Sequence, residues 1–239
     1  FGVRDALQLT ETIPHPELVT IHGELVHNET VQGRLQQRGF RTTPEDQRQA
    51  VPETKNVLIT AHGISERERL RLESAGKQLI DTTCPLVRQV HDAAQALSGA
   101  GYHVIVIGRP GHVEVQGIVE DLPNCEIVSD PSEVRTWQKA RLGIVCQTTT
   151  PPWLAEQIHA AIADRNPQAE IRFQNTICQP TRDRQQAVER LCRQVDVVIV
   201  VGGANSNNTR QLVALCQRQG TPAYHVQTAD DLSPAWFSD

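Results

Sequence analysis

The sequence lacks the features that mark membrane proteins and nucleic-acid-binding proteins. No apolar run approaches the roughly 18 to 20 residues that would span a bilayer. Basic residues are not in excess, because the formal net charge is -5. Arg67, Arg69 and Arg71 alternate with glutamates instead of forming a basic block. We therefore expect a soluble protein whose main partner is neither a membrane nor a nucleic acid.

Methionine is absent as well, and the first residues show no signal-peptide pattern. Because there is no initiator methionine, we expect that residues preceding Phe1 are missing from the chain as given. Six cysteines in 239 residues without a secretion signal are more typical of buried thiols or metal ligands than of a disulfide framework. The predicted compartment is the cytoplasm.

The common cofactor fingerprints are also missing. Gly202-Gly203 does not have the spacing of a G-x-G-x-x-G loop, no Walker sequence occurs, and the histidines match no compact zinc signature. A nucleotide cofactor is therefore not expected. Electrons for any redox step would have to come from outside the chain.

The sequence does contain short apolar runs that alternate with amphipathic stretches. The runs predicted as strands are Val57–Thr60, Val104–Gly108, Leu142–Cys146, Ile171–Phe173 and Val197–Val201. Three groups recur at helical spacing: Leu86, Val90, Ala94 and Leu97; Leu154, Ile158, Ala161 and Ile162; Val188, Leu191 and Val195. This alternation predicts an α/β protein with parallel sheets. Breaks near Cys84 and Cys178 divide it into three small α/β domains, residues 1–84, 85–177 and 178–239, the last of them incomplete.

Side chains capable of chemistry repeatedly follow the predicted strands. They are His62, Cys84, His112, Glu114, Thr148, Thr149, Cys178 and Ser206. In open α/β sheets, ligands bind outside the carboxyl ends of parallel strands. We therefore expect these residues to converge on one crevice between the domains.

Two of the six cysteines have local sequences that suit metal binding. Cys84, in Asp81-Thr82-Thr83-Cys84-Pro85, opens a helix whose dipole would favour the thiolate. Cys178 lies between a predicted strand and a helix in the same way. A small buried thiol is the simpler interpretation of either one alone. The other four, which lie in strands or on apolar helix faces, are expected to be structural: Cys125, Cys146, Cys192 and Cys216.

Histidines and a glycine-rich segment indicate a metal site or an anion site. His27, His62 and His112 each adjoin turn-forming or polar residues, and imidazole is readily protonated beside phosphate. The segment 202–208, Gly-Gly-Ala-Asn-Ser-Asn-Asn, precedes a helix and could cradle a phosphate. Glu114 is the carboxyl group best placed for proton transfer, with threonine hydroxyls to orient it. Ordinary surface histidines, a plain glycine turn and a solvated glutamate are the alternatives.

Together these motifs resemble the LytB family of 4-hydroxy-3-methylbut-2-enyl diphosphate reductases. The motifs, which occur in family order along nearly the whole chain, are Leu25-Val26-His27-Asn28, Ala61-His62-Gly63, Asp81-Thr82-Thr83-Cys84-Pro85, Gly111-His112-Val113-Glu114, Gln147-Thr148-Thr149, Cys178 with Thr181, Arg184 and Gln185, and Asn205-Ser206-Asn207-Asn208. The resemblance implies three α/β domains around a central [4Fe–4S] cluster held by three cysteines. Cys84 and Cys178 match two of these ligands, and the third would lie one residue before Phe1. The family's closing segment would follow Trp236, so the third domain is expected to be incomplete.

The resemblance also implies a reaction, the reductive dehydroxylation of the allylic diphosphate to isopentenyl and dimethylallyl diphosphate, which ends the non-mevalonate isoprenoid pathway. The implied substrate-binding residues are His27, His62, His112, Thr148, Thr149, Ser206, Asn207 and Asn208. Glu114, oriented by Thr148, would relay protons, and a ferredoxin or flavodoxin would supply electrons. The family usually has a serine where Asn207 stands, although an amide can still donate a hydrogen bond. Two other interpretations stay open, a zinc or iron hydrolase that uses the histidines and Glu114, and a clusterless diphosphate-binding remnant.

Overall fold

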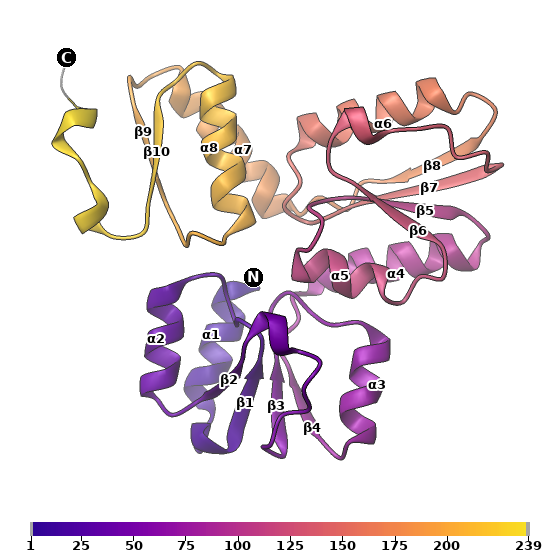
Figure 1. Ribbon diagram of the computed structural model, residues 1–239. Coiled ribbons are helices and arrows are strands. Elements are labelled where there is room, and N and C mark those ends of the chain that lie inside the picture. Colours follow the sequence, from indigo (N-terminus) through magenta and orange to yellow (C-terminus); the bar gives the residue numbers. More distant parts are fainter. Residues whose placement is uncertain (1, 238–239) are drawn as a thin grey trace.

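The computed structural model describes residues 2–237 and shows three parallel sheets with flanking helices (Figure 1). The first sheet has the order β2-β1-β3-β4, with β1 at Val19–His22, β2 at Arg41–Thr43, β3 at Asn56–Ile59 and β4 at Gln78–Asp81. Its helices and short 3-10 turns are α1 (Val3–Thr12), η1 (Pro16–Leu18), α2 (Glu29–Gln37), η2 (Glu45–Gln47) and α3 (Glu66–Ser74). Leu58 packs with α1 and α2, whereas Val57 and Ile59 pack with Leu72 of α3, so the helices cover opposite faces of the sheet.

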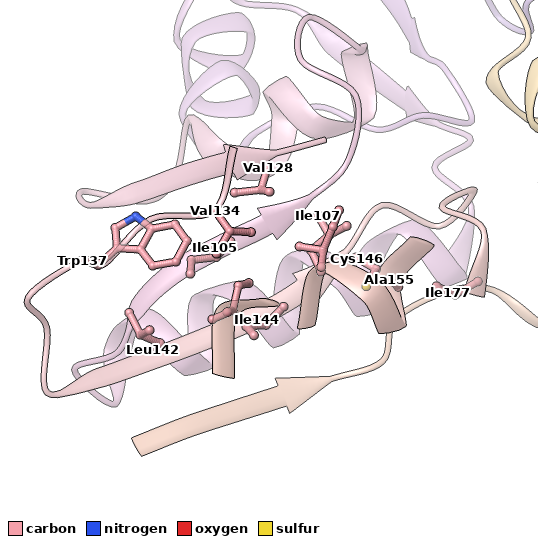
Figure 2. Packing of buried hydrophobic residues seen from close by; sticks show 12 residues of the cluster. Ile105, Ile107, Val128, Val134, Trp137, Leu142, Ile144, Cys146, Ala155 and Ile177 are labelled. Carbon is pink, nitrogen blue, oxygen red and sulfur yellow. The ribbon is translucent and has the colours of Figure 1, made fainter. Parts of the chain in front are cut away.

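The second sheet carries the two largest clusters of buried hydrophobic residues in the described range. Its order is β6-β5-β7-β8, with β5 at His103–Ile107, β6 at Cys125–Val128, β7 at Arg141–Cys146 and β8 at Glu170–Gln174. Its helices are α4 (Pro85–Gly99), α5 (Val113–Val119), η3 (Pro131–Glu133) and α6 (Pro152–Arg165). Figure 2 shows Ile105, Ile107 and Ile144 on the face that packs against α6, each fully buried. Each such side chain contributes about 1.5–3 kcal/mol through burial.

The third sheet is the smallest in the described range. It pairs β9 (Val198–Val201) in parallel with β10 (Ala223–Val226), and the neighbouring helices are α7 (Gln179–Cys192) and α8 (Asn207–Arg218). Two further 3-10 turns follow, η4 (Ala229–Asp231) and η5 (Pro234–Trp236). Val188, Cys192 and Cys216 pack against Val198 and Val200.

The α/β class with parallel sheets is confirmed, and each strand predicted from an apolar run lies within a residue or so of an observed one. One helical face was predicted wrongly. Helix α7 ends at Cys192, and both Leu191 and Val195 are exposed, because Cys192 rather than Leu191 continues the apolar face begun by Val188. The division into three domains stays a prediction. Within the described range, no helix combines the length and the apolar character needed to cross a membrane.

Candidate functional site

One cavity, with a volume of 420 Å³, brings together the polar side chains that follow the strands. Every residue predicted to act at the site lines it, namely His27, His62, Cys84, His112, Glu114, Thr148, Thr149, Cys178, Ser206, Asn207 and Asn208. In the second sheet, the chain crosses from β5 outward to β6 and then back to β7 and β8, so the direction of winding reverses between β5 and β7. Such a switch point is where α/β sheets bind ligands. The expected convergence is thus observed, whereas the role of each residue stays a prediction.

Three histidines from two sheets form a compact group in this cavity. The rings of His27 and His62 stack with centroids 4.4 Å apart, and His112 meets them edge-on at 5.5 and 5.7 Å. His27 is held by Glu24, whose Oε2 lies 2.8 Å from Nδ1. His112 caps helix α5, since its Nδ1 accepts a hydrogen bond from the backbone N–H of Glu114. An accepting Nδ1 means that neutral His112 carries its proton on Nε2.

The electrostatics of His62 and His112 favour neutral rings when no anion is present. Burial, followed by the proximity of His27 and His112, holds the pKa of His62 well below its usual range. Burial also lowers the pKa of His112 to about 4. His27 Nε2 and His62 Nδ1 are buried without a hydrogen-bond partner among the described residues. Unpaired ring nitrogens at a cavity wall are suited to bind a ligand that supplies the missing hydrogen bonds and negative charge.

Glu114 is the buried carboxyl group of the cavity, with 2% of its surface exposed. Thr148 holds both of its oxygens, because the Thr148 backbone N–H donates to Oε1 at 2.7 Å and its hydroxyl donates to Oε2 at 3.0 Å. Burial raises the pKa of Glu114 to about 7, and these hydrogen bonds only partly oppose that rise. A carboxyl group that titrates near neutral pH can both donate and accept a proton under working conditions.

Cys84 and Cys178 begin helices on the cavity wall, as the sequence predicted. Cys84 is the N-cap residue of α4 and Cys178 is that of α7. The backbone N–H of Cys178 donates to Thr148 O, and its Sγ lies 3.1 Å from Thr181 Oγ1. The start of the described chain also reaches this wall, since a Cβ built on Gly2 would lie 3.2 Å from Cys84 Sγ. Thiol sulfur at a helix N-terminus suits an iron–sulfur cofactor.

The other four cysteines lie away from the cavity, as expected. Burial raises the pKa of Cys146 to about 12, and burial together with the neighbouring Cys192 raises that of Cys216 to about 12. All six cysteines are free thiols. In the described part of the chain, no three His, Cys, Asp or Glu side chains gather in a way that could hold one metal ion. The hydrolase interpretation needs such a group, so the described residues do not support it. The ligand role of Cys84 and Cys178 stays a prediction.

The third sheet contributes the loop between β9 and α8. Ser206 caps α8 and accepts a hydrogen bond from the Thr209 N–H, while Asn208 Oδ1 is buried without a partner among the described residues. Asn207 crosses to the second sheet, where its Nδ2 donates to Thr149 Oγ1 at 2.7 Å. Gly203 is required here, because a Cβ on it would collide with the backbone carbonyl of His27. This close approach is what brings the loop to the histidines.

Sequence reasoning did not identify the roles of Glu24 and Arg48, which act on His27 and His62. Glu24 orients His27, and a carboxylate three residues before a histidine was the available signal. Arg48, whose positive charge lowers the pKa of His62, lies in the polar stretch after Pro44, where no local motif marks it. Only the packing of the loop near the cavity reveals that contribution.

Comparison with known proteins identifies relatives that match nearly the whole chain. The family model described as LytB protein matches residues 1–239. The 4-hydroxy-3-methylbut-2-enyl diphosphate reductase of Methylibium petroleiphilum is 40% identical over 92% of this chain and 67% of its own length, and that of an Anaeromyxobacter species is 33% identical over 100% and 84%. The solved Plasmodium falciparum E-1-hydroxy-2-methyl-but-2-enyl-4-diphosphate reductase superposes with a TM-score of 0.85 at 28% identity, covering 98% of this chain and 73% of that one. A second solved (E)-4-hydroxy-3-methyl-but-2-enyl diphosphate reductase, at 32% identity, superposes with a TM-score of 0.70 over 99% and 85%. The chain therefore belongs to the LytB family.

Proposed function

We propose that this chain is an oxidoreductase that converts 4-hydroxy-3-methylbut-2-enyl diphosphate to isopentenyl and dimethylallyl diphosphate. The reaction consumes two electrons and two protons, breaks the allylic C–O bond and releases water. The observation that carries the proposal is the shared cavity, in which a carboxyl group with a pKa of about 7, a group of three contacting histidine rings and two helix-capping cysteines face one space. The family membership and the names of the relatives support the same reaction.

The diphosphate would be held by the histidines together with the loop before α8. His27, His62 and His112 offer ring nitrogens, and protonation of buried rings beside the anion would add positive charge. Ser206, Asn207 and Asn208 lie at the N-terminus of a helix, which favours phosphate oxygens. Anchoring one end of the substrate in this way presents its hydroxyl group to the rest of the cavity, so remote binding energy serves the chemistry.

Glu114 would deliver the proton that lets the hydroxyl group leave as water. At pH 7 about half of the Glu114 carboxyl groups are protonated, since the pKa is about 7. Thr148, whose Oγ1 lies 3.0 Å from Glu114 Oε2, would orient the carboxyl group and contact the substrate hydroxyl. The proton for the allyl carbon would come from Glu114 or from the bound diphosphate, and the end of the allyl system that receives it decides between the two products.

Cys84 and Cys178 would hold a [4Fe–4S] cluster, with a further cysteine ligand that the resemblance places before Phe1. When bound, this group supplies electrons and a Lewis-acidic iron for the leaving oxygen. A one-electron carrier, ferredoxin or flavodoxin, would supply the electrons, because the sequence has no nucleotide-binding fingerprint of its own. The cytoplasm remains the predicted compartment.

Anaerobic iron–sulfur reconstitution tests the proposal. The chain, and a form extended at its start by a Gly-Phe-Cys segment, would be assayed for iron and sulfide content, visible absorption and turnover of the allylic diphosphate. We expect cluster formation and turnover in the extended form, loss of both in Cys84→Ser and Cys178→Ser, and no loss in the matched control Cys125→Ser. Diphosphate binding without a cluster in either form would favour the binding-remnant interpretation, and one bound zinc without sulfide would favour the hydrolase.

A further inference from the structure

Asn207 makes a direct contact between the third sheet and the second. It is the first residue of α8, only 5% of its surface is exposed, and its Nδ2 donates to Thr149 Oγ1 at 2.7 Å. The two residues lie 58 positions apart in the sequence. A partly buried side-chain hydrogen bond between two elements this distant constrains both of them.

The neighbours of Asn207 are engaged differently. The Ser206 hydroxyl oxygen caps α8, because it accepts a hydrogen bond from the Thr209 N–H. The bond to Thr149 therefore depends on Asn207. A serine at this position would carry its hydroxyl one bond closer to the backbone than the amide nitrogen, so it would reach Thr149 less well.

Thr149 belongs to a loop whose other members are already fixed from the second sheet. The Gln147 N–H and the Thr150 hydroxyl both donate to Ile107 O, at 2.8 and 3.1 Å. Thr148 is bound to Glu114 through two hydrogen bonds. Among the hydroxyls of this loop, that of Thr149 is held from the opposite side, by the third sheet.

The direction of the hydrogen bond decides what Thr149 can do. An amide nitrogen only donates, so Thr149 Oγ1 must accept. Its own hydroxyl hydrogen is then free to point elsewhere, and Thr149 lines the cavity. A hydroxyl that donates into the cavity suits an anion, whereas one turned back toward Asn207 would present its lone pairs and disfavour an anion.

We propose that Asn207 is a positioning residue, which orients the Thr149 hydroxyl as a hydrogen-bond donor to the substrate's diphosphate. This inference rests on the proposed function, because it names the diphosphate as the ligand of the cavity. Asn207 therefore affects the affinity for diphosphate through the Thr149 hydroxyl.

The test is a double-mutant cycle read by calorimetric titration with inorganic diphosphate. We expect Asn207→Ala and Thr149→Val each to weaken binding about tenfold, the effect of one hydrogen bond to a charged acceptor. The double variant should bind no more weakly than the weaker single variant, because both changes remove the same donor. Thr149→Ser keeps the hydroxyl and should recover most of the affinity that Thr149→Val loses. The control Asn124→Ala, which changes an exposed asparagine outside the cavity, should bind like the wild type.

The variant Asn207→Asp tests whether Asn207 orients the Thr149 hydroxyl or only links the second and third sheets. A carboxylate can still bond Thr149, but only by accepting its hydrogen, so the link between the sheets is kept and the donor is lost. The added negative charge weakens diphosphate binding both with Thr149 present and in the Thr149→Val variant. The loss caused by Asn207→Asp should therefore be at least about threefold larger with Thr149 present than in Thr149→Val, while the thermal midpoint stays close to that of the wild type.

The outcomes distinguish this inference from the function on which it rests. Equal losses in the two backgrounds, or unchanged binding by Asn207→Ala, would overturn the role of Asn207 while leaving diphosphate binding intact. If the wild-type chain itself fails to bind diphosphate and His62→Ala changes nothing, the proposed function fails, and this inference fails with it.

Discussion

Glu114 in the cavity and Glu68 on helix α3 both lie in the first turn of a helix, but their pKa values are shifted in opposite directions. Burial would raise the pKa of both. At Glu68, hydrogen bonds from Arg71 and His22 overcome that effect and bring the pKa down to about 2. At Glu114 only the neutral Thr148 and Gln147 assist, and the pKa rises to about 7.

The comparison shows that the protonation state of a partly or fully buried glutamate depends on whether its hydrogen-bond partners are charged or neutral. The positively charged Arg71 keeps Glu68 ionised. A separate contact between His22 and Glu68 ties β1 to α3. Glu114 receives hydrogen bonds that hold its geometry without a cation that would keep it ionised. A carboxyl group can be fixed in place and still change its protonation state when its partners are neutral donors.

Replacing Glu114 has the largest predicted effect. We expect Glu114→Gln to reduce turnover of the allylic diphosphate by about 10²- to 10⁴-fold, the usual contribution of a positioned proton donor. Affinity for inorganic diphosphate should change little, because the histidines remain. Steady-state kinetics of the reconstituted enzyme would measure this, with the exposed Glu66→Gln as the control. A loss below about threefold would mean that another group supplies the proton.

The same variant should be more stable than the wild type at alkaline pH. The native pKa of Glu114, about 7, lies above the unfolded value of 4.5, so its contribution is fully present below pH 4.5 and is lost as pH rises through 7. We expect Glu114→Gln to gain about 3 kcal/mol in free energy of unfolding at pH 8 and nothing at pH 4. Urea titrations at the two pH values would show this, and an equal gain at both would contradict the raised pKa.

Glu68→Gln should shift stability in the opposite direction and by less. Its native pKa, about 2, lies below the unfolded value of 4.5, so its contribution is present above pH 4.5 and is lost as pH falls through 2. After allowance for screening by solvent, we expect a loss of about 1–2 kcal/mol at pH 7. The gap to the wild type should close in acid, and turnover should be unchanged. A loss that persists at pH 2 would point to packing instead of charge.

The histidines should give the smallest effect, an uptake of protons when diphosphate binds. The free rings of His62 and His112 have lowered pKa values and are neutral at pH 7, whereas a bound anion stabilises the charged form. Calorimetry in buffers of different ionisation enthalpy should detect roughly one to two protons taken up at pH 7. His112→Asn should reduce the uptake, and His225→Asn, outside the cavity, should not.

Much of the candidate site could be predicted because parallel sheets obey a local rule. His62, Glu114 and Cys178 were identified as residues that follow apolar strands, and that position places them at the carboxyl edge in any such sheet. The helix caps of Cys84 and Cys178 were likewise local, since a proline one or two residues later marks a helix start. The error at Leu191 and Val195 shows the limit, because periodicity alone does not say where a helix ends.

Other features were out of reach because they join distant segments. The sequence around Arg48 gives no sign that its charge acts on His62, and the sequence around Asn207 gives no sign that its side chain binds Thr149. The opposite pKa shifts of Glu68 and Glu114 are also invisible in the sequence, where both are glutamates at the start of helical stretches. Protonation depends on burial and on which donors lie within a few ångströms, and both come from packing.

By itself, the sequence determined the parallel α/β class, the family membership and the set of residues that could carry chemistry. These follow from apolar periodicity and from motifs read along one chain. Only the tertiary structure decided that His27 and His62 stack, that Glu114 is buried among neutral donors, and that Asn207 binds Thr149 across two sheets. Burial and contact between distant segments exist only once the sheets have packed together, and they set the charge and the orientation of each group.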